Sequence, residues 1–94
     1  MKVLNRHDGV QMDDSNIIYI GRPGMFGNPF QMHGEDSRKE VIERYRLWFD
    51  GQMRFYPQFR LRVLQLRGHD LACWCAPKPC HGDVIIDWLN KHEE

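Results

Sequence analysis

The sequence predicts a small, single α/β domain over residues 1–94, with a three-stranded, mostly parallel sheet and about three helices. Three short apolar runs, at residues 2–5, 17–20 and 71–75, have the composition of strands, and three longer segments place apolar residues at helical spacing. Two of those segments lie between the second and third strands, an order that requires a parallel, right-handed crossover. A chain of 94 residues has a thin core.

The three predicted strands differ in the strength of their signal. Residues 2–5 form a short apolar run, and a polar, turn-rich loop follows at 6–16. Residues 17–20, Ile-Ile-Tyr-Ile, are β-branched and aromatic, which makes them the clearest strand. Alternation in 71–75 divides the side chains between two faces, with Leu71, Cys73 and Cys75 on one and Ala72 and Trp74 on the other.

The first predicted helix covers residues 37–50. Ser37 and Glu40 match a capping box at its start, and Gly51 suits the position just past its end. Its buried stripe is expected to comprise Val41, Ile42, Tyr45, Trp48 and Phe49.

Two more helices are predicted further along the chain. Pro57 is expected to open the second, which ends before Gly68. The last begins near Cys80, and its apolar stripe is formed by Val84, Ile85, Trp88 and Leu89.

The segment 21–30, Gly-Arg-Pro-Gly-Met-Phe-Gly-Asn-Pro-Phe, cannot form a regular element because it holds three glycines and two prolines. Glycines let a backbone approach a ligand closely, and prolines fix its path. A rigid loop directly after a strand favours ligand binding over a purely structural loop, although both readings stay open. The segment matches neither common phosphate-loop pattern.

The crossover places the carboxyl ends of strands 17–20 and 71–75 at the same edge of the sheet. Ligands of open α/β sheets bind at this edge, so the glycine loop and the cysteine-containing loop 75–83 are predicted to share one pocket. The expected ligand-binding residues are Gly21, Arg22, Pro23, Phe26, Gly27, Asn28, Arg38, Trp74 and Gly82.

The residues of the cysteine loop are compatible with two functions, a zinc site or a catalytic thiol. Cys73, Cys75, Cys80 and His81 have the composition of a Cys3His zinc site, although their spacing is poor for one ion. Alternatively, the helix N-terminus lowers the pKa of Cys80, and Cys80, His81 and Asp83 act as catalytic residues if the protein is an enzyme. Whether it is an enzyme stays open.

A third interpretation assigns the loop to packing and anion binding. Cys73 and Cys75 are then small buried hydrophobes, and the amides near Gly82 hold a phosphate or carboxylate together with Arg22. Because nine of the 13 basic residues are arginines, planar contact with anionic oxygens is a further hint in the same direction.

Composition limits the classes of partner and the cellular compartment that we expect for this protein. The formal net charge is zero, with 13 basic and 13 acidic residues, which makes nucleic acid an unlikely ligand. No stretch resembles a signal peptide or a membrane span, so we expect a cytoplasmic protein with reduced thiols and no membrane partner. The small core also favours a homo-oligomer.

Several motifs resemble a small family of phage and bacterial proteins that is known only as a domain of unknown function. They are Ile18-Tyr19-Ile20-Gly21-Arg22-Pro23, Phe26-Gly27-Asn28-Pro29-Phe30, Leu71-Ala72-Cys73-Trp74-Cys75-Ala76-Pro77 and Cys80-His81-Gly82-Asp83. The resemblance spans residues 2–90 and implies a compact α/β domain of phage or prophage origin, which would act in the host cytoplasm. It implies no activity.

Together these features favour a domain that binds a phosphorylated, nucleotide-like small molecule, to sequester or process it, in a pocket between loops 21–30 and 75–83. No cofactor is certain, and zinc is the one considered. The alternative is a zinc-stabilised interaction module that inhibits a host protein, with its contact surface formed by Trp48, Phe55 and Tyr56.

Overall fold

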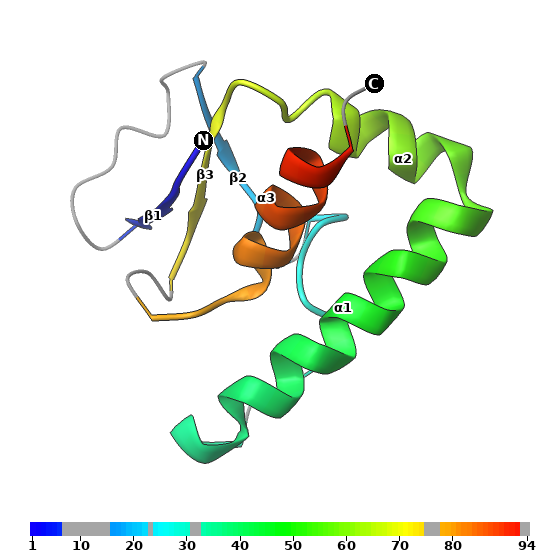
Figure 1. Ribbon diagram of the computed structural model, residues 1–94. Coiled ribbons are helices and arrows are strands. Elements are labelled where there is room, and N and C mark those ends of the chain that lie inside the picture. Colours follow the sequence, from blue (N-terminus) through cyan, green and yellow to red (C-terminus); the bar gives the residue numbers. More distant parts are fainter. Residues whose placement is uncertain (7–15, 23, 31–32, 75–77, 93–94) are drawn as a thin grey trace.

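The computed structural model describes residues 1–6, 16–22, 24–30, 33–74 and 78–92. It confirms the predicted α/β fold. In chain order the elements are β1 (Val3–Asn5), β2 (Ile17–Tyr19), the 3-10 helix η2 (Glu35–Ser37), α1 (Arg38–Phe55), α2 (Pro57–Leu64), β3 (Asp70–Cys73) and α3 (His81–Lys91) (Figure 1).

The three strands form one sheet in the order β1-β3-β2, and both pairings are parallel. Leu71 of the central strand lies in register with Val3 on one side and Ile18 on the other. The β2 side of the ladder continues by one more bond, from the Ile20 amide to the Ala72 oxygen. The carboxyl ends of all three strands therefore point to one edge, and the crossover argument predicts this for β2 and β3.

Helix α1 is longer than predicted. It continues through Gly51 to Phe55, because buried Met53 extends the apolar stripe by another turn and a glycine costs a helix interior only about 1 kcal/mol. Pro57 ends it, since a residue that precedes proline is disfavoured in helical conformation and Tyr56 is extended.

The predicted capping box of Ser37 and Glu40 is not formed. Ser37 belongs to η2, and its hydroxyl accepts from the His33 amide (2.8 Å) and donates to the Gly34 oxygen (2.9 Å). The Glu40 side chain instead pairs with Arg44 at 2.7 Å. The Ser37 hydroxyl therefore forms hydrogen bonds within the turn that precedes α1 and does not form the helix cap that the sequence pattern predicts.

Helix α3 lies between the sheet and α1, and it contacts both β3 and α1 (Figure 1). Its buried residues Val84, Ile85 and Leu89 belong to the same hydrophobic cluster as Tyr45 and Phe49 of α1 and Phe59 and Val63 of α2. Helix α2 is shorter than predicted, because residues 65–68 form turns that end at Gly68, whose φ is +87°.

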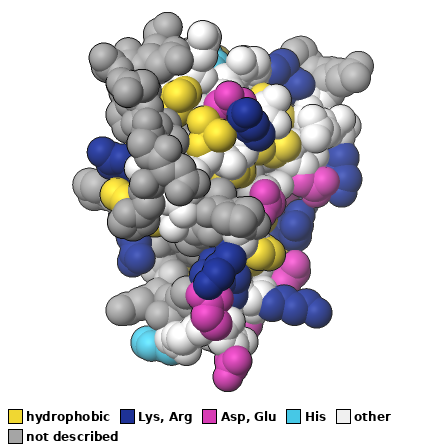
Figure 2. Space-filling view, turned by 90° about the vertical axis from the view of Figure 1, so that its left-hand side faces the viewer, with side chains coloured by type: hydrophobic (Ala, Val, Ile, Leu, Met, Phe, Trp, Pro, Cys, Tyr) yellow, Lys and Arg dark blue, Asp and Glu magenta, His cyan; other side chains and the backbone are white. Residues whose placement is uncertain are grey.

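One face of this fold carries mixed charge. On the face toward which β1 lies, Figure 2 shows basic and acidic side chains of the described residues next to one another. Among the described residues, no helix is both long and apolar enough to cross a membrane.

Candidate functional site

A cavity of about 200 Å³ opens at the edge of the sheet where β2 and β3 end. Residues of the glycine loop, of the segment around Cys80 and of α1 form its walls. The structure thus brings together the two loops that the sequence places at one edge. The lining residues are Gly21, Arg22, Asn28, Phe30, Arg38, Val41, Ile42, Cys73, Trp74, Pro79, Cys80 and His81.

His81 is the buried polar residue of this cavity. Its Nε2 lies 2.8 Å from the main-chain oxygen of Ile20. A carbonyl oxygen only accepts, so Nε2 carries the proton and Nδ1 keeps a lone pair. Burial lowers the pKa of His81, the bond to Ile20 opposes that effect, and the nearby positive charge of Arg22 lowers the pKa further. The imidazole is therefore neutral near pH 7.

The orientation of this imidazole is fixed by packing as well. The Tyr45 ring meets it edge-on, with ring centroids 5.0 Å apart. The Tyr45 hydroxyl in turn donates to the Phe26 oxygen at 2.8 Å, so α1 is joined to the glycine loop. His81 lines the cavity, and among the described residues Nε2 is the ring nitrogen with a hydrogen-bond partner, so Nδ1 is left as an acceptor in a fixed tautomer.

Cys80 is the N-cap of α3 and takes part in a capping box. Its sulfur accepts from the Gly82 amide at 3.3 Å, while the Asp83 carboxylate accepts from the Cys80 amide at 3.0 Å. The same sulfur lies 3.3 Å from that of Cys73. This contact and burial raise the pKa of the Cys80 thiol more than the Gly82 amide lowers it.

The expectation of a low thiol pKa at Cys80 is therefore wrong. A helix N-terminus favours a thiolate only when the thiol is not buried against a second one, and Cys80 is 3% exposed. Asp83 serves as a capping residue, and among the described residues no hydrogen bond joins its carboxylate to His81. The structure does not support a Cys80, His81 and Asp83 catalytic set.

The predicted anion site near Gly82 is also corrected. The Gly82 amide donates to the Cys80 sulfur and the Asp83 amide donates to the Cys80 oxygen at 3.1 Å, so the chain itself satisfies both. Gly82 is buried, and a Cβ placed there would lie 2.8 Å from Ile20 Cδ1 and 2.9 Å from Val3 Cγ2. This glycine lets α3 approach the sheet and does not line the cavity.

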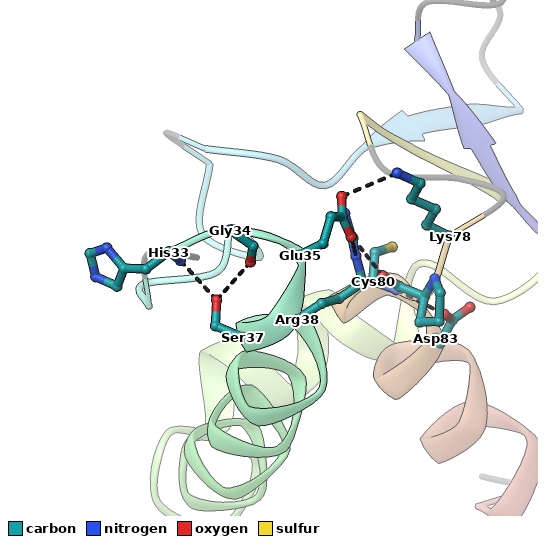
Figure 3. A network of polar contacts seen from close by, with 9 residues as sticks. His33, Gly34, Glu35, Ser37, Arg38, Lys78, Cys80 and Asp83 are labelled. Atoms are coloured by element: carbon teal, nitrogen blue, oxygen red, sulfur yellow. Dashed lines mark hydrogen bonds and ion pairs between the residues drawn. The ribbon is translucent and has the colours of Figure 1, made fainter.

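Arg38 connects the start of α1 to the cysteine loop (Figure 3). Its guanidinium holds both carboxylate oxygens of Glu35, at 2.8 and 2.9 Å, and donates to the Pro79 oxygen at 2.9 Å. Lys78 adds a second cation at 3.1 Å from Glu35, and these hydrogen bonds from Arg38 and Lys78 hold the pKa of Glu35 at about 2. Arg38 lines the cavity, but its charge is already balanced.

Arg22 differs from Arg38 in both exposure and pairing. It is exposed, and among the described residues no carboxylate pairs with its guanidinium. Its main-chain oxygen accepts from the Tyr19 hydroxyl at 3.0 Å, which in turn accepts from Trp74 Nε1 at 3.1 Å. Arg6 lies over both rings, 4.8 Å from the Tyr19 centroid and 5.2 Å from that of Trp74. Arg22 is thus a cavity-lining cation without a carboxylate partner among the described residues, and the guanidinium of Arg6 lies close by over two aromatic rings.

The structure places the remaining predicted residues differently. Phe26 does not offer a stacking surface, because it is buried and packs on Phe59 with centroids 5.8 Å apart. Gly27 is buried against the Arg22 backbone. Asn28 does line the cavity, and its side-chain oxygen accepts from the Phe30 amide at 2.8 Å. Pro23 lies outside the described residues.

Four apolar lining residues were not predicted as site residues: Phe30, Val41, Ile42 and Pro79. The sequence does contain an indication for Val41 and Ile42, because they begin the apolar stripe of the helix that follows the glycine loop and therefore lie near that loop. Phe30 ends that loop. Nothing in the sequence pattern distinguishes it from Phe26.

The described residues contain no group of three or more His, Cys, Asp or Glu side chains that could hold a metal ion. Of the predicted zinc ligands, Cys73 and Cys80 are brought together, and His81 uses Nε2 for Ile20. Cys75 lies outside the described residues.

Comparison with known proteins identifies related sequences. The sequence profile of a family described as a domain of unknown function (DUF4326) matches residues 3–91. An uncharacterized 12.4 kDa protein in the nrdA-td intergenic region of Enterobacteria phage T4 is 34% identical over 76 residues, which cover 79% of this chain and 68% of that protein. No solved structure matches the chain.

Proposed function

Because the chain belongs to DUF4326, a family of unknown function, we propose its function from the cavity itself: it binds a phosphorylated, nucleotide-like small molecule. The observation that carries the proposal is an apolar cavity lined by Arg22, a cation without a carboxylate partner among the described residues, and by His81, whose Nδ1 is left as an acceptor. These three features match the parts of a nucleotide. Such a molecule has a flat apolar ring, ring N–H or sugar O–H donors, and an anionic phosphate.

The cavity size limits which part of the ligand is enclosed. Sites that bury a whole drug-sized ligand usually measure about 300–1,000 Å³, whereas this cavity is about 200 Å³. We therefore assign the ring of the ligand to the cavity and its phosphate to the exposed mouth. Phe30, Val41 and Ile42 supply the apolar walls that such a ring needs.

Polar recognition within the cavity depends on the tautomer of His81. The bond from Nε2 to Ile20 fixes Nδ1 as an acceptor, so a ligand N–H or O–H is favoured there over a second acceptor. An acceptor in that position would leave two lone pairs facing each other, which costs the desolvation of both. The site therefore discriminates between donors and acceptors on the enclosed ring.

Arg22 supports the anionic part of the proposal. The guanidinium of Arg38 is held by Glu35 and Pro79, so Arg22 is the lining cation that can pair with a ligand phosphate. A guanidinium binds a phosphate through two parallel N–H donors. Because Arg22 is exposed, the contribution of this contact should weaken as salt concentration rises.

Binding is favoured over processing. A nucleophilic thiol needs a thiolate, and the pKa of Cys80 is raised by Cys73 and by burial. Its sulfur already serves as the cap of α3. Sequestration of a nucleotide-like molecule is thus the simplest use of this cavity, and the phage relative is compatible with that use.

Isothermal titration calorimetry of the purified chain tests the proposal. The panel comprises purine and pyrimidine nucleoside monophosphates and diphosphates, the matching nucleosides, and inorganic phosphate. We expect a nucleotide to bind more tightly than its nucleoside, and inorganic phosphate to bind weakly. A protein that binds none of these molecules, or that binds phosphate as tightly as any nucleotide, would rule the proposal out.

A further inference from the structure

Cys73 and Cys80 form a pair of buried thiols whose sulfurs are 3.3 Å apart. Cys73 is the last residue of β3, and Cys80 is the residue that caps α3. Their exposed fractions are 2% and 3%. The pair is separate from the ligand contacts proposed above, since neither thiol is assigned a contact with the ligand.

The backbone on both sides of the pair is held in place. Cys73 lies in the parallel ladder opposite Asn5, and the Cys80 amide is bonded to the Asp83 carboxylate. A disulfide bond is about 2.05 Å long, so the two sulfurs need to approach by only about 1 Å. Side-chain rotation can supply much of that distance without a change in the ladder or in the helix.

A small oxidant can reach these sulfurs. Both cysteines line the cavity, which opens at the surface beside half-exposed Trp74. A peroxide is small enough to enter a cavity of about 200 Å³. Larger disulfide reagents such as oxidised glutathione would meet the buried pair less readily.

We propose that Cys73 and Cys80 form a reversible intramolecular disulfide when the protein encounters a peroxide. One thiol attacks the peroxide O–O bond and becomes a sulfenic acid, with release of water when the oxidant is hydrogen peroxide. The second thiol then displaces the sulfenic oxygen as a second water molecule, and the S–S bond forms. Two thiols are oxidised, one peroxide is reduced, and no other reactant is required.

The disulfide would connect the end of β3 to the start of α3 across the wall of the cavity. It closes the chain segment from residue 73 to residue 80, which restricts the unfolded state and stabilises the fold. It also changes the sulfur that accepts from the Gly82 amide at 3.3 Å. The raised pKa of Cys80 lowers its thiolate population, which makes the reaction with a peroxide slow.

The test uses the Cys75→Ser variant, so that Cys73 and Cys80 are its only thiols. The variant is treated with hydrogen peroxide and unfolded, its free thiols are alkylated, and its intact mass is measured. We expect the loss of two hydrogens, no alkylation, a higher unfolding temperature, and full reversal by dithiothreitol. Retention of two alkylatable thiols, or the addition of oxygen atoms in place of hydrogen loss, would overturn the proposal.

Two further measurements separate the pair from other thiol chemistry. The Cys73→Ala variant keeps Cys75 and Cys80, and we expect it not to lose two hydrogens under the same treatment. If it does so as fast as Cys75→Ser, the pairing assigned to Cys73 is wrong. Metal analysis of the untreated protein provides the second check, since one tightly bound zinc per chain would mean that the pair is a metal ligand and not a disulfide former.

Discussion

The Nε2 atom of His81 lies 2.8 Å from the main-chain oxygen of Ile20, which bonds the first turn of α3 directly to the end of β2. This bond fixes the imidazole tautomer and holds one wall of the cavity to another. A charged imidazole would still donate to Ile20 through Nε2, but its Nδ1 would no longer be an acceptor, and burial penalises the charged form. The stability of this edge of the sheet is therefore linked to pH.

Acidification should destabilise the protein as the pH falls below about 6.5, the ordinary pKa of histidine. The folded-state pKa of His81 is lowered, so the unfolded chain takes up this proton at a higher pH than the folded chain does. The contribution of neutral His81 to stability is complete above the pKa of histidine in the unfolded chain, and it is lost as the pH falls through the pKa of His81 in the folded protein. Urea unfolding in small pH steps measures the effect.

Two variants isolate this histidine. His81→Gln removes the titrating group and keeps an amide N–H that can donate to Ile20, so it should flatten the pH dependence in this window. His33→Gln changes an exposed histidine and should leave the dependence as it is. Glu35 has a pKa of about 2 and loses its charge only at lower pH. An unchanged slope in His81→Gln would contradict the assignment.

Two glycines should respond in opposite directions to the same substitution. Gly82→Ala places a Cβ within 2.9 Å of Val3 and Ile20, so we expect a loss of about 1–2 kcal/mol from overpacking. Gly51→Ala meets nothing within 4 Å inside α1 and should add about 0.5–1 kcal/mol. Urea denaturation of the two variants measures both changes, and a neutral Gly82→Ala would show that the α3–sheet contact is looser than described.

The sequence was sufficient for the three strands and for the sheet edge at which the two loops meet, because both follow from patterns that span whole elements, whereas the strand order β1-β3-β2 was not predicted. Alternating and helical spacing identify the strands and helices, and the parallel crossover then places the ends of 17–20 and 71–75 at one edge. The end of α1 was missed because Gly51 is a weak helix breaker, whereas buried Met53 lies beyond it.

The chemistry within the site could not be predicted in the same way. The pKa of Cys80 depends on a sulfur seven residues away, and the sequence pattern contains only the helix N-terminus that acts in the opposite direction. Phe26 and Phe30 lie in the same loop, and only the fold determines that Phe26 joins the core while Phe30 faces the cavity. The hydrogen bonds from Arg38 to Glu35 and Pro79 likewise become visible only in the folded structure.

Arg38 should matter more for stability than its partner Glu35 does. The Arg38 side chain is 13% exposed and bonds the Pro79 oxygen, whereas Glu35 is 57% exposed and screened by water. We expect Arg38→Met to cost about 0.5–1.5 kcal/mol, because the hydrogen bond to the Pro79 carbonyl is lost. Glu35→Gln should cost clearly less. Thermal unfolding compares the two, and equal losses would mean that the Pro79 bond contributes nothing.

The native thiols should react slowly with iodoacetamide. Cys80 has a raised pKa because of Cys73 and burial, and each unit of increase lowers the thiolate population about tenfold. In Cys75→Ser at neutral pH, alkylation should be at least about tenfold slower in the folded protein than in urea. Equal rates in the two states would show that the pair is accessible and ionised, which is the reactive-thiolate alternative.

Replacement of Arg22 should separate phosphate recognition from ring recognition. Arg22→Met removes the cavity-lining guanidinium that has no carboxylate partner among the described residues, and a charge-assisted contact of about 1.4 kcal/mol corresponds to a tenfold loss of affinity. We therefore expect nucleotide binding to weaken about tenfold while nucleoside binding stays the same. Arg44→Met is the matched control, because Arg44 lies on the exposed face of α1 and pairs with Glu40. Calorimetry at two salt concentrations completes the test, since the Arg22 contribution should shrink at high salt. If Arg22→Met weakened nucleosides and nucleotides equally, Arg22 would shape the cavity and would not hold the phosphate.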